Sequence, residues 1–267
     1  LEIADIYASL GDYAQMMDYF FSSISSSTMS RIEARLTSIV ASDENGTATG
    51  IIEKAIIEKN KKAPNSELVN NLLVWLYVQT YRNKLALNQL IAFHKRRGTN
   101  DTEIYNFANS MASAEEYDIA VSAYDYLAKL KNKSSLSADA YLGYLNVKYL
   151  QIVSQINPDR AEWERLDSLM GASLNEASPK DSYQIILSQA KIKSYYLNKH
   201  SEAIDLISKA IASNKYRQNN NDLKLLLGDI YLLNSNPWDA TLVYAQVEKS
   251  NAQPDVVSEA RFRKAKV

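Results

Sequence analysis

Residues 227–247 read LGDIYLLNSNPWDATLVYAQV, and the pattern in this stretch decides the fold. Apolar residues recur at three- and four-residue spacing before and after a short polar segment, Asn234-Ser235-Asn236, which predicts two helices joined by a tight turn. Pro237 suits the first position of the second helix, because no N–H donor is needed there. The small Ala240 lets the antiparallel helices approach closely, and Tyr244 fills the gap against the next pair.

The same small-then-large spacing recurs elsewhere in the chain. Three further alanines are each followed four residues later by a larger side chain, in the pairs Ala86 and Leu90, Ala120 and Tyr124, and Ala203 and Ile207. Ala86 and Ala120 are 34 residues apart, and the apolar positions of the segments that precede them coincide. A repeat of about this length in a helical pattern is typical of tandem helix pairs, which bury their apolar faces against one another.

Helical periodicity extends over nearly the whole chain, and short polar segments interrupt it at regular intervals. Asp101 and Asp181 are predicted N-caps, because a carboxylate there can accept the unpaired N–H groups of a first helical turn. The pattern predicts about fifteen helices, at residues 1–9, 12–25, 29–42, 48–61, 65–80, 83–96, 101–113, 116–131, 136–154, 158–171, 181–196, 200–213, 220–233, 237–249 and 254–267.

The composition also favours an all-α fold. The chain of 267 residues contains 7 Gly and 5 Pro, fewer turn residues than a β-sandwich or a doubly wound sheet requires. Lys and Arg number 30 and Asp and Glu 31, so the net charge of -1 gives no overall attraction to nucleic acid. The absence of Cys excludes disulfides, thiol nucleophiles and Cys-based zinc sites.

No apolar run approaches the roughly 18 residues that a membrane span requires, so we expect no membrane insertion within this chain. The longest candidate is the segment 72–78. A chain without Cys is compatible with an oxidising or a reducing compartment. Our expectation is a bacterial periplasm or cell envelope rather than the cytoplasm.

The unit that begins at Leu227-Gly228 resembles the tetratricopeptide repeat, in which Leu-Gly is followed by Tyr, then by Ala, then by an aromatic residue. Tyr231, Ala240 and Tyr244 occupy those positions. The start of the chain has the same order of residue types, with Ile3-Ala4, Tyr7, Gly11, Tyr13, Met16 and Phe20. By this resemblance, repeats cover segments near 1–27, 67–98, 101–132, 184–215 and 221–252, and degenerate repeats cover 30–62 and 136–172.

The resemblance implies a right-handed superhelical solenoid of antiparallel helix pairs, with the first helix of each pair lining the concave face. We expect one continuous array over residues 1–267, made of about seven helix pairs and a truncated terminal helix. We therefore expect a fragment of a longer bacterial array, whose apolar end faces favour self-association.

The resemblance also implies a function, that of a scaffold that binds a peptide or protein partner on the concave face. Trp75, Tyr105 and Tyr195 are the principal candidates for contact, because aromatic side chains with a polar tip bury much area for little rotamer entropy. The alternative interpretation is that these three pack between neighbouring helices. The full set of predicted partner contacts, all at inward-facing positions, is Asn71, Trp75, Gln79, Tyr105, Asn109, Tyr144, Lys148 and Tyr195.

One subclass of the family grips the C-terminal carboxylate of a peptide with Lys and Asn side chains. Asn109 occupies the Asn-type position, but Tyr105 stands at the preceding Lys-type position. We therefore expect no clamp of this kind.

No sequence motif predicts catalysis, a metal site or a cofactor. The chain lacks a phosphate loop, and its two histidines, His94 and His200, lie in different repeats. Ser188 and Lys191 match a Ser-x-x-Lys motif, but the accompanying motifs of that enzyme class are absent, so we interpret the match as chance. Two alternatives stay open: a regulatory or substrate-presenting arm of a larger enzyme or envelope complex, and a self-associating structural spacer.

Overall fold

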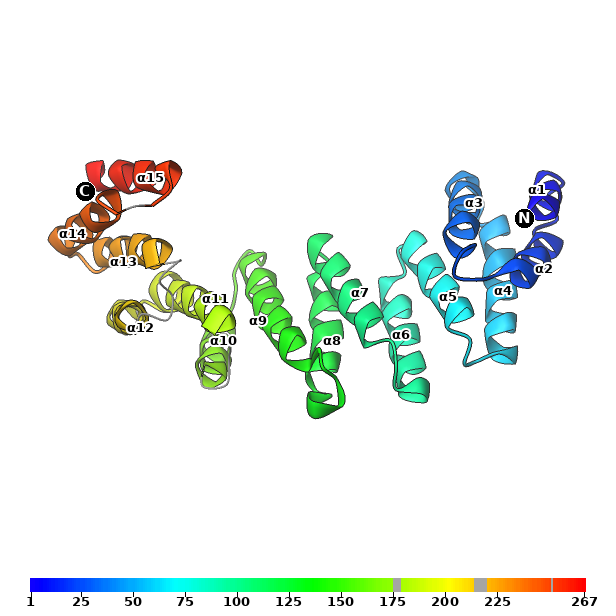
Figure 1. Cartoon of the computed structure of the whole chain (residues 1–267), viewed down its shortest axis with the longest axis horizontal. Helices are drawn as coiled ribbons and strands as arrows, with labels where there is room; N and C mark the ends of the chain where they lie inside the picture. The colour runs from blue at the N-terminus through cyan, green and yellow to red at the C-terminus, as the bar shows by residue number, and fades with distance from the viewer. Residues whose placement is uncertain (175–178, 214–219, 251) are drawn as a thin grey trace. The chain divides into compact units, whose positions relative to one another are not determined.

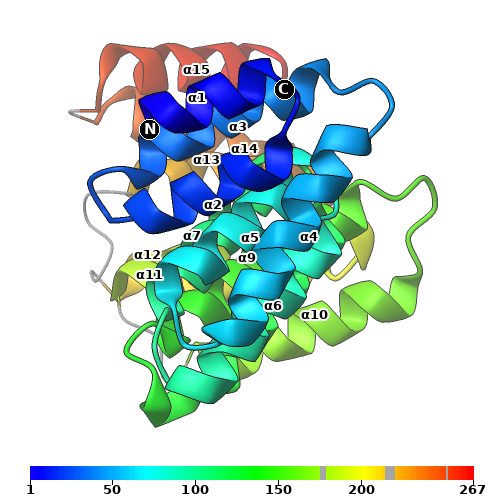
Figure 2. The same ribbon diagram turned by 90° about the vertical axis from the view of Figure 1, so that its right-hand side faces the viewer.

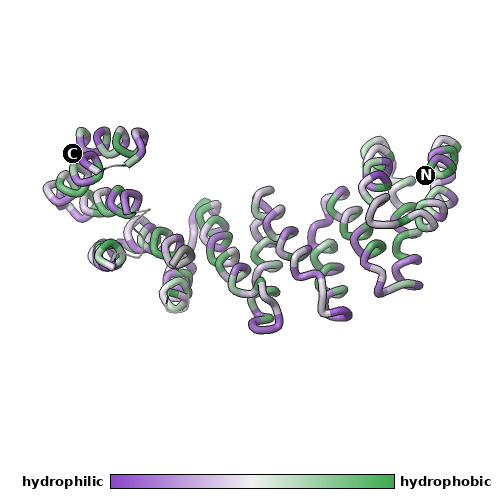
Figure 3. The backbone as a smooth tube through the Cα atoms, in the orientation of Figure 1, coloured by the Kyte–Doolittle hydropathy of each residue, from purple (hydrophilic) through white to green (hydrophobic). Residues whose placement is uncertain are grey.

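The computed structural model of the chain describes residues 1–174, 179–213, 220–250 and 252–267. These residues form fifteen α-helices and no β-strand, which confirms the predicted all-α fold (Figure 1). Figure 3 shows hydrophobic and hydrophilic residues alternating along the helices, as expected for helices that bury one face. Within the described ranges, no helix combines the length and the hydrophobicity that crossing a membrane would require.

The chain divides into two compact units, Leu1–Tyr141 and Leu142–Val267, which are described separately. The first unit contains α1 (Glu2–Ser9), α2 (Tyr13–Ser23), α3 (Met29–Ser42), α4 (Thr47–Lys62), α5 (Glu67–Gln79), α6 (Asn83–Arg97), α7 (Asp101–Ser113), α8 (Tyr117–Ala128), a 3₁₀ turn η1 (Lys131–Lys133) and the start of α9 (Ser137–Val153). The second contains the rest of α9, then α10 (Arg160–Ser173), α11 (Pro179–Lys191), the π-helical η2 (Ile192–Tyr196), α12 (His200–Ala212), α13 (Asn220–Leu233), α14 (Pro237–Glu248) and α15 (Pro254–Ala265). The continuity of the array across both units and its superhelical hand remain predictions.

The first unit is built from helices that pack on their neighbours in the chain, most extensively in the pairs α1/α2, α5/α6 and α7/α8 (Figures 1 and 2). One buried cluster joins Phe20 of α2, Ile32 of α3, Ile52 of α4 and Leu72 of α5. The segment 30–62 therefore folds as two packed helices although it lacks aromatic anchors, because α3 and α4 supply buried Ile and Leu side chains instead.

In the second unit, α11, α12, α13 and α14 each pack on the next helix in the chain. The closest approach is between α13 and α14, at Gly228. A β-carbon on Gly228 would lie 2.3 Å from Cε1 of Tyr244, whose side chain is fully buried. The glycine of the Leu-Gly pair is therefore required by the tyrosine ring that follows it in the repeat.

The predicted helix 181–196 ends at the predicted residue, but in the structure it begins earlier and its last turn is π-helical. It begins at Pro179, so Asp181 lies inside the first turn and is not the N-cap. After Lys191 the chain continues as one π-helical turn, in which the N–H of Leu197 donates to the carbonyl of Ile192 at 3.1 Å. The widened turn places Tyr196 flat against Trp163 of α10, with ring centroids 4.0 Å apart.

The π-helical turn also carries a largely buried ion pair. Lys193 Nζ donates to Asp167 Oδ2 at 2.9 Å and to Glu202 Oε2 at 2.7 Å, and thus links α10 to α12. Gln189 Nε2 donates to the other oxygen of Asp167 at 2.8 Å. Because both Asp167 oxygens accept hydrogen bonds, the buried carboxylate is satisfied.

Two predictions about helix starts have opposite outcomes. Pro237 occupies the first turn of α14, as expected. Asp101 is not the N-cap of α7, because Asn100 takes that position with a left-handed backbone, φ +71°. Asp101 Oδ1 instead lies 2.8 Å from Nε2 of His94 in the preceding helix.

Candidate functional site

Two of the predicted partner contacts, Tyr105 and Asn109, are brought together on α7 by Tyr124 of α8. The hydroxyl of Tyr124 donates to Oδ1 of Asn109, and the ring of Tyr124 packs edge-on against Tyr105, with centroids 5.7 Å apart. Tyr124 is buried, Tyr105 is half-buried and Asn109 is exposed. The buried tyrosine therefore fixes the orientation of an exposed amide.

The electrostatics of this cluster follow from its burial. Burial, with a smaller effect of the neighbouring Tyr105, raises the pKa of Tyr124 to about 12. Burial also raises the pKa of Tyr105, and the exposed carboxylate of Asp139 adds to that effect. Both hydroxyls remain protonated at neutral pH, so that of Tyr124 can serve as the donor to Asn109.

The three predicted contacts on α5 have different surroundings. Trp75 is half-buried and packs against the core cluster of the first unit, as the alternative interpretation expected. Asn71 is half-buried, and its Oδ1 accepts a long hydrogen bond of 3.4 Å from Asn70 Nδ2. Gln79 is exposed and lines an open hollow together with Glu53 and Arg82, which form an ion pair at 2.9 Å.

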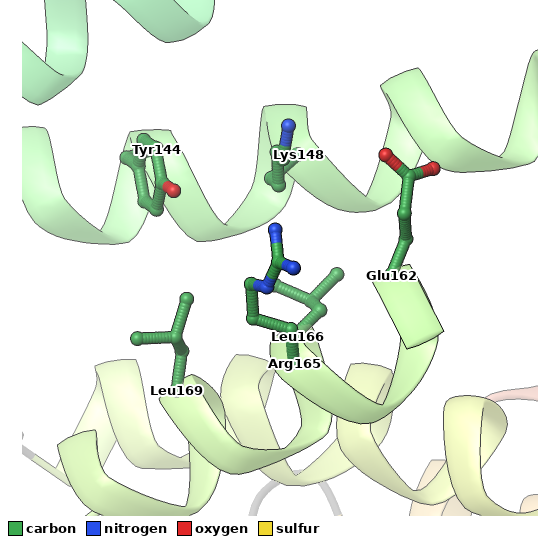
Figure 4. A pocket seen from close by; sticks show the side chains of 6 residues that line it. All are labelled: Tyr144, Lys148, Glu162, Arg165, Leu166 and Leu169. Atoms are coloured by element: carbon green, nitrogen blue, oxygen red, sulfur yellow. The ribbon is translucent and has the colours of Figure 1, made fainter. Parts of the chain in front are cut away.

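Tyr144 and Lys148 lie one turn apart on α9 and line a small cleft against α10 (Figure 4). The cleft has a volume of about 30 Å³. From α10 it is lined by Glu162, Arg165, Leu166 and Leu169. Of the eight predicted contacts, Tyr144 and Lys148 line this cleft and Gln79 lines the open hollow beside Arg82.

Tyr195, the last predicted contact, is 43% exposed and lies in the π-helical turn. Burial raises its pKa, and the nearby carboxylate of Asp229 raises it further. Asp229 also accepts a hydrogen bond of 2.7 Å from the hydroxyl of Tyr244 and pairs with Arg263 of α15. Tyr195 is therefore placed beside a polar cluster that ties α13, α14 and α15 together.

The eight predicted contacts are divided between the two units, which are described separately. Asn71, Trp75, Gln79, Tyr105 and Asn109 belong to the first unit, and Tyr144, Lys148 and Tyr195 to the second. Their placement on one common face remains a prediction.

Sequence reasoning missed two residues that matter at these places. Tyr124 was assigned only to packing, although its hydroxyl orients Asn109. Tyr244 lies 15 residues after Asp229, as Tyr124 lies 15 residues after Asn109. This recurring spacing is a signal in the sequence that could have revealed the contact. Arg165 lies on a second helix, a position for which the repeat pattern predicts no contact.

Of the residues considered for catalysis, His94 is part of the packing. His94 is buried, with Nδ1 2.8 Å from the hydroxyl of Tyr126 and Nε2 facing Asp101. Ser188 is half-buried on α11, and His200 is the first residue of α12. Among the residues that the structure describes, no group of His, Asp and Glu side chains is arranged to hold a metal ion.

Solved structures provide the comparison with known proteins. A tetratricopeptide repeat protein from Parabacteroides merdae is 14% identical over 99% of this chain and 96% of that chain, with a TM-score of 0.43. The C-terminal part of a TPR repeat-containing protein from Cytophaga hutchinsonii is 12% identical over 97% and 98%, with a TM-score of 0.49. A thermophilic TPR protein from Thermus thermophilus is 15% identical over 73% and 98%, with a TM-score of 0.47.

The chain is similar to tetratricopeptide repeat proteins. No protein-family model matches the sequence, and no curated protein matches it. The assignment of repeated helix pairs to this chain rests on the spacing and packing of its own residues, above all the fit of Tyr244 over Gly228.

Proposed function

We propose that the chain is a protein-interaction scaffold whose first helices bind a peptide or protein partner. The observation that carries the proposal is the hydrogen bond from the hydroxyl of Tyr124 to Oδ1 of Asn109. Because the oxygen of the amide is taken, its NH₂ group is turned away from Tyr124 on an exposed side chain. An oriented donor of this kind suits a carbonyl or carboxylate oxygen of an extended peptide.

The half-buried ring of Tyr105 supports the proposal, because it provides aromatic contact area one helical turn from Asn109. The edge-on contact with Tyr124 restrains this ring before a partner arrives. Pre-ordered side chains lose little entropy on binding, so a short peptide can gain useful affinity from few contacts.

The experiment selects peptides from a random library displayed on phage against the full chain, and measures the affinity of one synthesised peptide by calorimetry. Asn109→Asp keeps the acceptor for Tyr124 but removes the NH₂ donor. The pair of Tyr244 and Asp229 shows that the fold accepts an aspartate at this position of a repeat. We expect this variant to weaken binding about five- to tenfold, the value of one hydrogen bond.

Asn106→Asp is the matched control, because Asn106 is exposed on the same helix and its substitution changes the charge equally. We expect this control to change the affinity less than about twofold. Equal effects of the two variants, an unchanged affinity in Asn109→Asp, or a library that yields no binding peptide would contradict the proposal.

A self-associating spacer is the second candidate, and the surface of α1 favours it. Ile3, Ile6 and Leu10 recur at helical spacing and are 50%, 58% and 72% exposed. An exposed apolar stripe of this kind promotes association between copies. Light scattering over a concentration series tests this candidate. A molecular mass that rises with concentration in the wild type but not in Ile6→Lys would favour the spacer. A constant monomer mass would contradict it.

A further inference from the structure

The cleft between α9 and α10 contains two cationic side chains from opposite walls. Lys148 comes from α9 and Arg165 from α10, and Figure 4 shows the guanidinium of Arg165 directed toward Lys148. Leu166 and Leu169 line the same cleft, and Leu166 is buried. Lys148 is half-buried and Arg165 is exposed, so two cations line one cleft beside an apolar wall.

The charges of this cleft are only partly compensated. Lys148 Nζ donates to the neutral amide oxygen of Gln151 at 2.7 Å. Arg165 is exposed and makes no hydrogen bond or ion pair among the described residues. Glu162 is the carboxylate that lines the cleft, and its Oε2 accepts from Gln155 at 3.0 Å. Two cations against one carboxylate leave an excess positive charge.

We propose that this cleft binds a side-chain carboxylate of an acidic peptide segment, an inference that rests on the proposed scaffold function. A carboxylate between Lys148 and Arg165 would relieve the repulsion of the two cations and accept charge-assisted hydrogen bonds from both. Arginine is suited to this role, because its planar fork matches the two oxygens of a carboxylate. The volume of about 30 Å³ admits a group of that size, and Tyr144 borders it.

The experiment measures binding of a rhodamine-labelled, C-terminally amidated hexaglutamate peptide to the full chain, by fluorescence anisotropy at low ionic strength. Arg165→Gln and Lys148→Gln should each weaken binding about three- to tenfold, since each removes one attractive charge. Glu162→Gln removes the competing carboxylate and should strengthen binding about two- to threefold. A purely structural role of these residues would not produce effects of opposite sign.

Lys209→Gln is the matched control, because Lys209 is an exposed lysine of α12 in the same unit and loses the same charge. This control should change the affinity less than about twofold. Circular dichroism checks that each variant keeps its helix content. Equal weakening by Lys209→Gln and Lys148→Gln would show unspecific attraction and overturn the proposal, as would wild-type protein that leaves the peptide free.

Two further arms identify the source of the carboxylate. A hexaglutamate peptide with a free C-terminus should bind within about twofold of the amidated one, and a gain of more than about tenfold would contradict a side-chain ligand. Sodium acetate should displace the peptide no better than sodium chloride at equal ionic strength. Better displacement by acetate would show that the cleft binds small anions and would contradict the proposal. If hexaglutamate fails but Asn109→Asp still weakens the selected peptide, only this inference falls.

Discussion

The hydroxyl of Tyr244 donates a hydrogen bond of 2.7 Å to Asp229, which lies 15 residues earlier on the preceding helix. Tyr124 and Asn109 repeat this contact with the same separation, at the same positions relative to Ala120 and Ala240. In both of these repeats, the tyrosine that packs beside the small alanine also holds a polar side chain of the first helix by a hydrogen bond. Packing and the presentation of polar groups are therefore coupled in these repeats.

Gly228→Ala is predicted to destabilise the second unit. The new β-carbon would lie 2.3 Å from Cε1 of Tyr244, and that ring cannot yield, because it is fully buried and its hydroxyl is tied to Asp229. We expect the free energy of unfolding to fall by about 2–3 kcal/mol, as measured by urea denaturation.

Gly50→Ala is the control for this substitution. Gly50 lies inside α4, and apart from its chain neighbours and the backbone of its own helix no atom lies within 4 Å of an added β-carbon. Alanine there should raise stability by about 0.5–1 kcal/mol through its better helix propensity. Destabilisation by both substitutions, or by neither, would show that the contact with Tyr244 is not what requires glycine.

Tyr244→Phe and Tyr124→Phe are predicted to differ in cost. The first removes a hydrogen bond to a carboxylate and should cost about 1.5–3 kcal/mol, whereas the second removes one to a neutral amide and should cost about 0.5–1.5 kcal/mol. Urea denaturation of both variants against wild type measures the difference. A larger loss from Tyr124→Phe would argue against the charged acceptor as the reason.

The stability of the first unit is predicted to fall in alkaline solution. The pKa of Tyr124 is raised to about 12 in the folded chain by burial and by Tyr105, whereas an unfolded tyrosine titrates near its ordinary value of 10. The unfolded state therefore loses its proton first, so stability is fully present below about pH 10 and declines from there to about pH 12.

Urea denaturation at a series of pH values, with tyrosinate absorbance recorded in parallel, checks this prediction. Tyr124→Phe should make the decline shallower, because one titrating group with a raised pKa is removed. A decline of equal slope in the variant would assign the effect to other tyrosines.

Lys193→Met is predicted to destabilise the second unit by about 3 kcal/mol, because it removes the nearer cation of the largely buried Asp167 and leaves Lys199 Nζ at 3.9 Å. Lys129→Met removes a lysine that pairs with Asp125 on the surface, and should cost less than about 0.5 kcal/mol. Thermal and urea unfolding of both variants provide the comparison. Similar small losses in the two variants would mean that Gln189 and Lys199 hold Asp167 adequately without Lys193.

Much of the fold follows from the sequence, because helical periodicity and short polar turns are local signals. The predicted ranges 29–42 and 101–113 coincide with α3 and α7. The capping of helix starts depends partly on tertiary contacts and follows less well from the sequence. The residue type of Asp101 predicts an N-cap, but its carboxylate faces His94 of the preceding helix, a contact that local sequence does not reveal.

The π-helical turn at Ile192–Tyr196 has no comparable local signal. It results from the stacking of Tyr196 on Trp163 and the reach of Lys193 to Asp167, both of which join residues more than twenty positions apart. The candidate contacts show the same limit. Inward-facing positions follow from the repeat, but the cleft formed with Arg165 depends on how α9 and α10 pack.

The side-chain amide resonances of Asn109 provide the most direct test of partner binding on the first helices. They can be assigned in a ¹⁵N spectrum of the full chain by their loss in Asn109→Asp. On addition of a selected peptide, our account predicts that these resonances move as the NH₂ group finds an acceptor, while those of Asn106 stay in place. Saturation of the chain with peptide while the Asn109 amide resonances remain unmoved would contradict it.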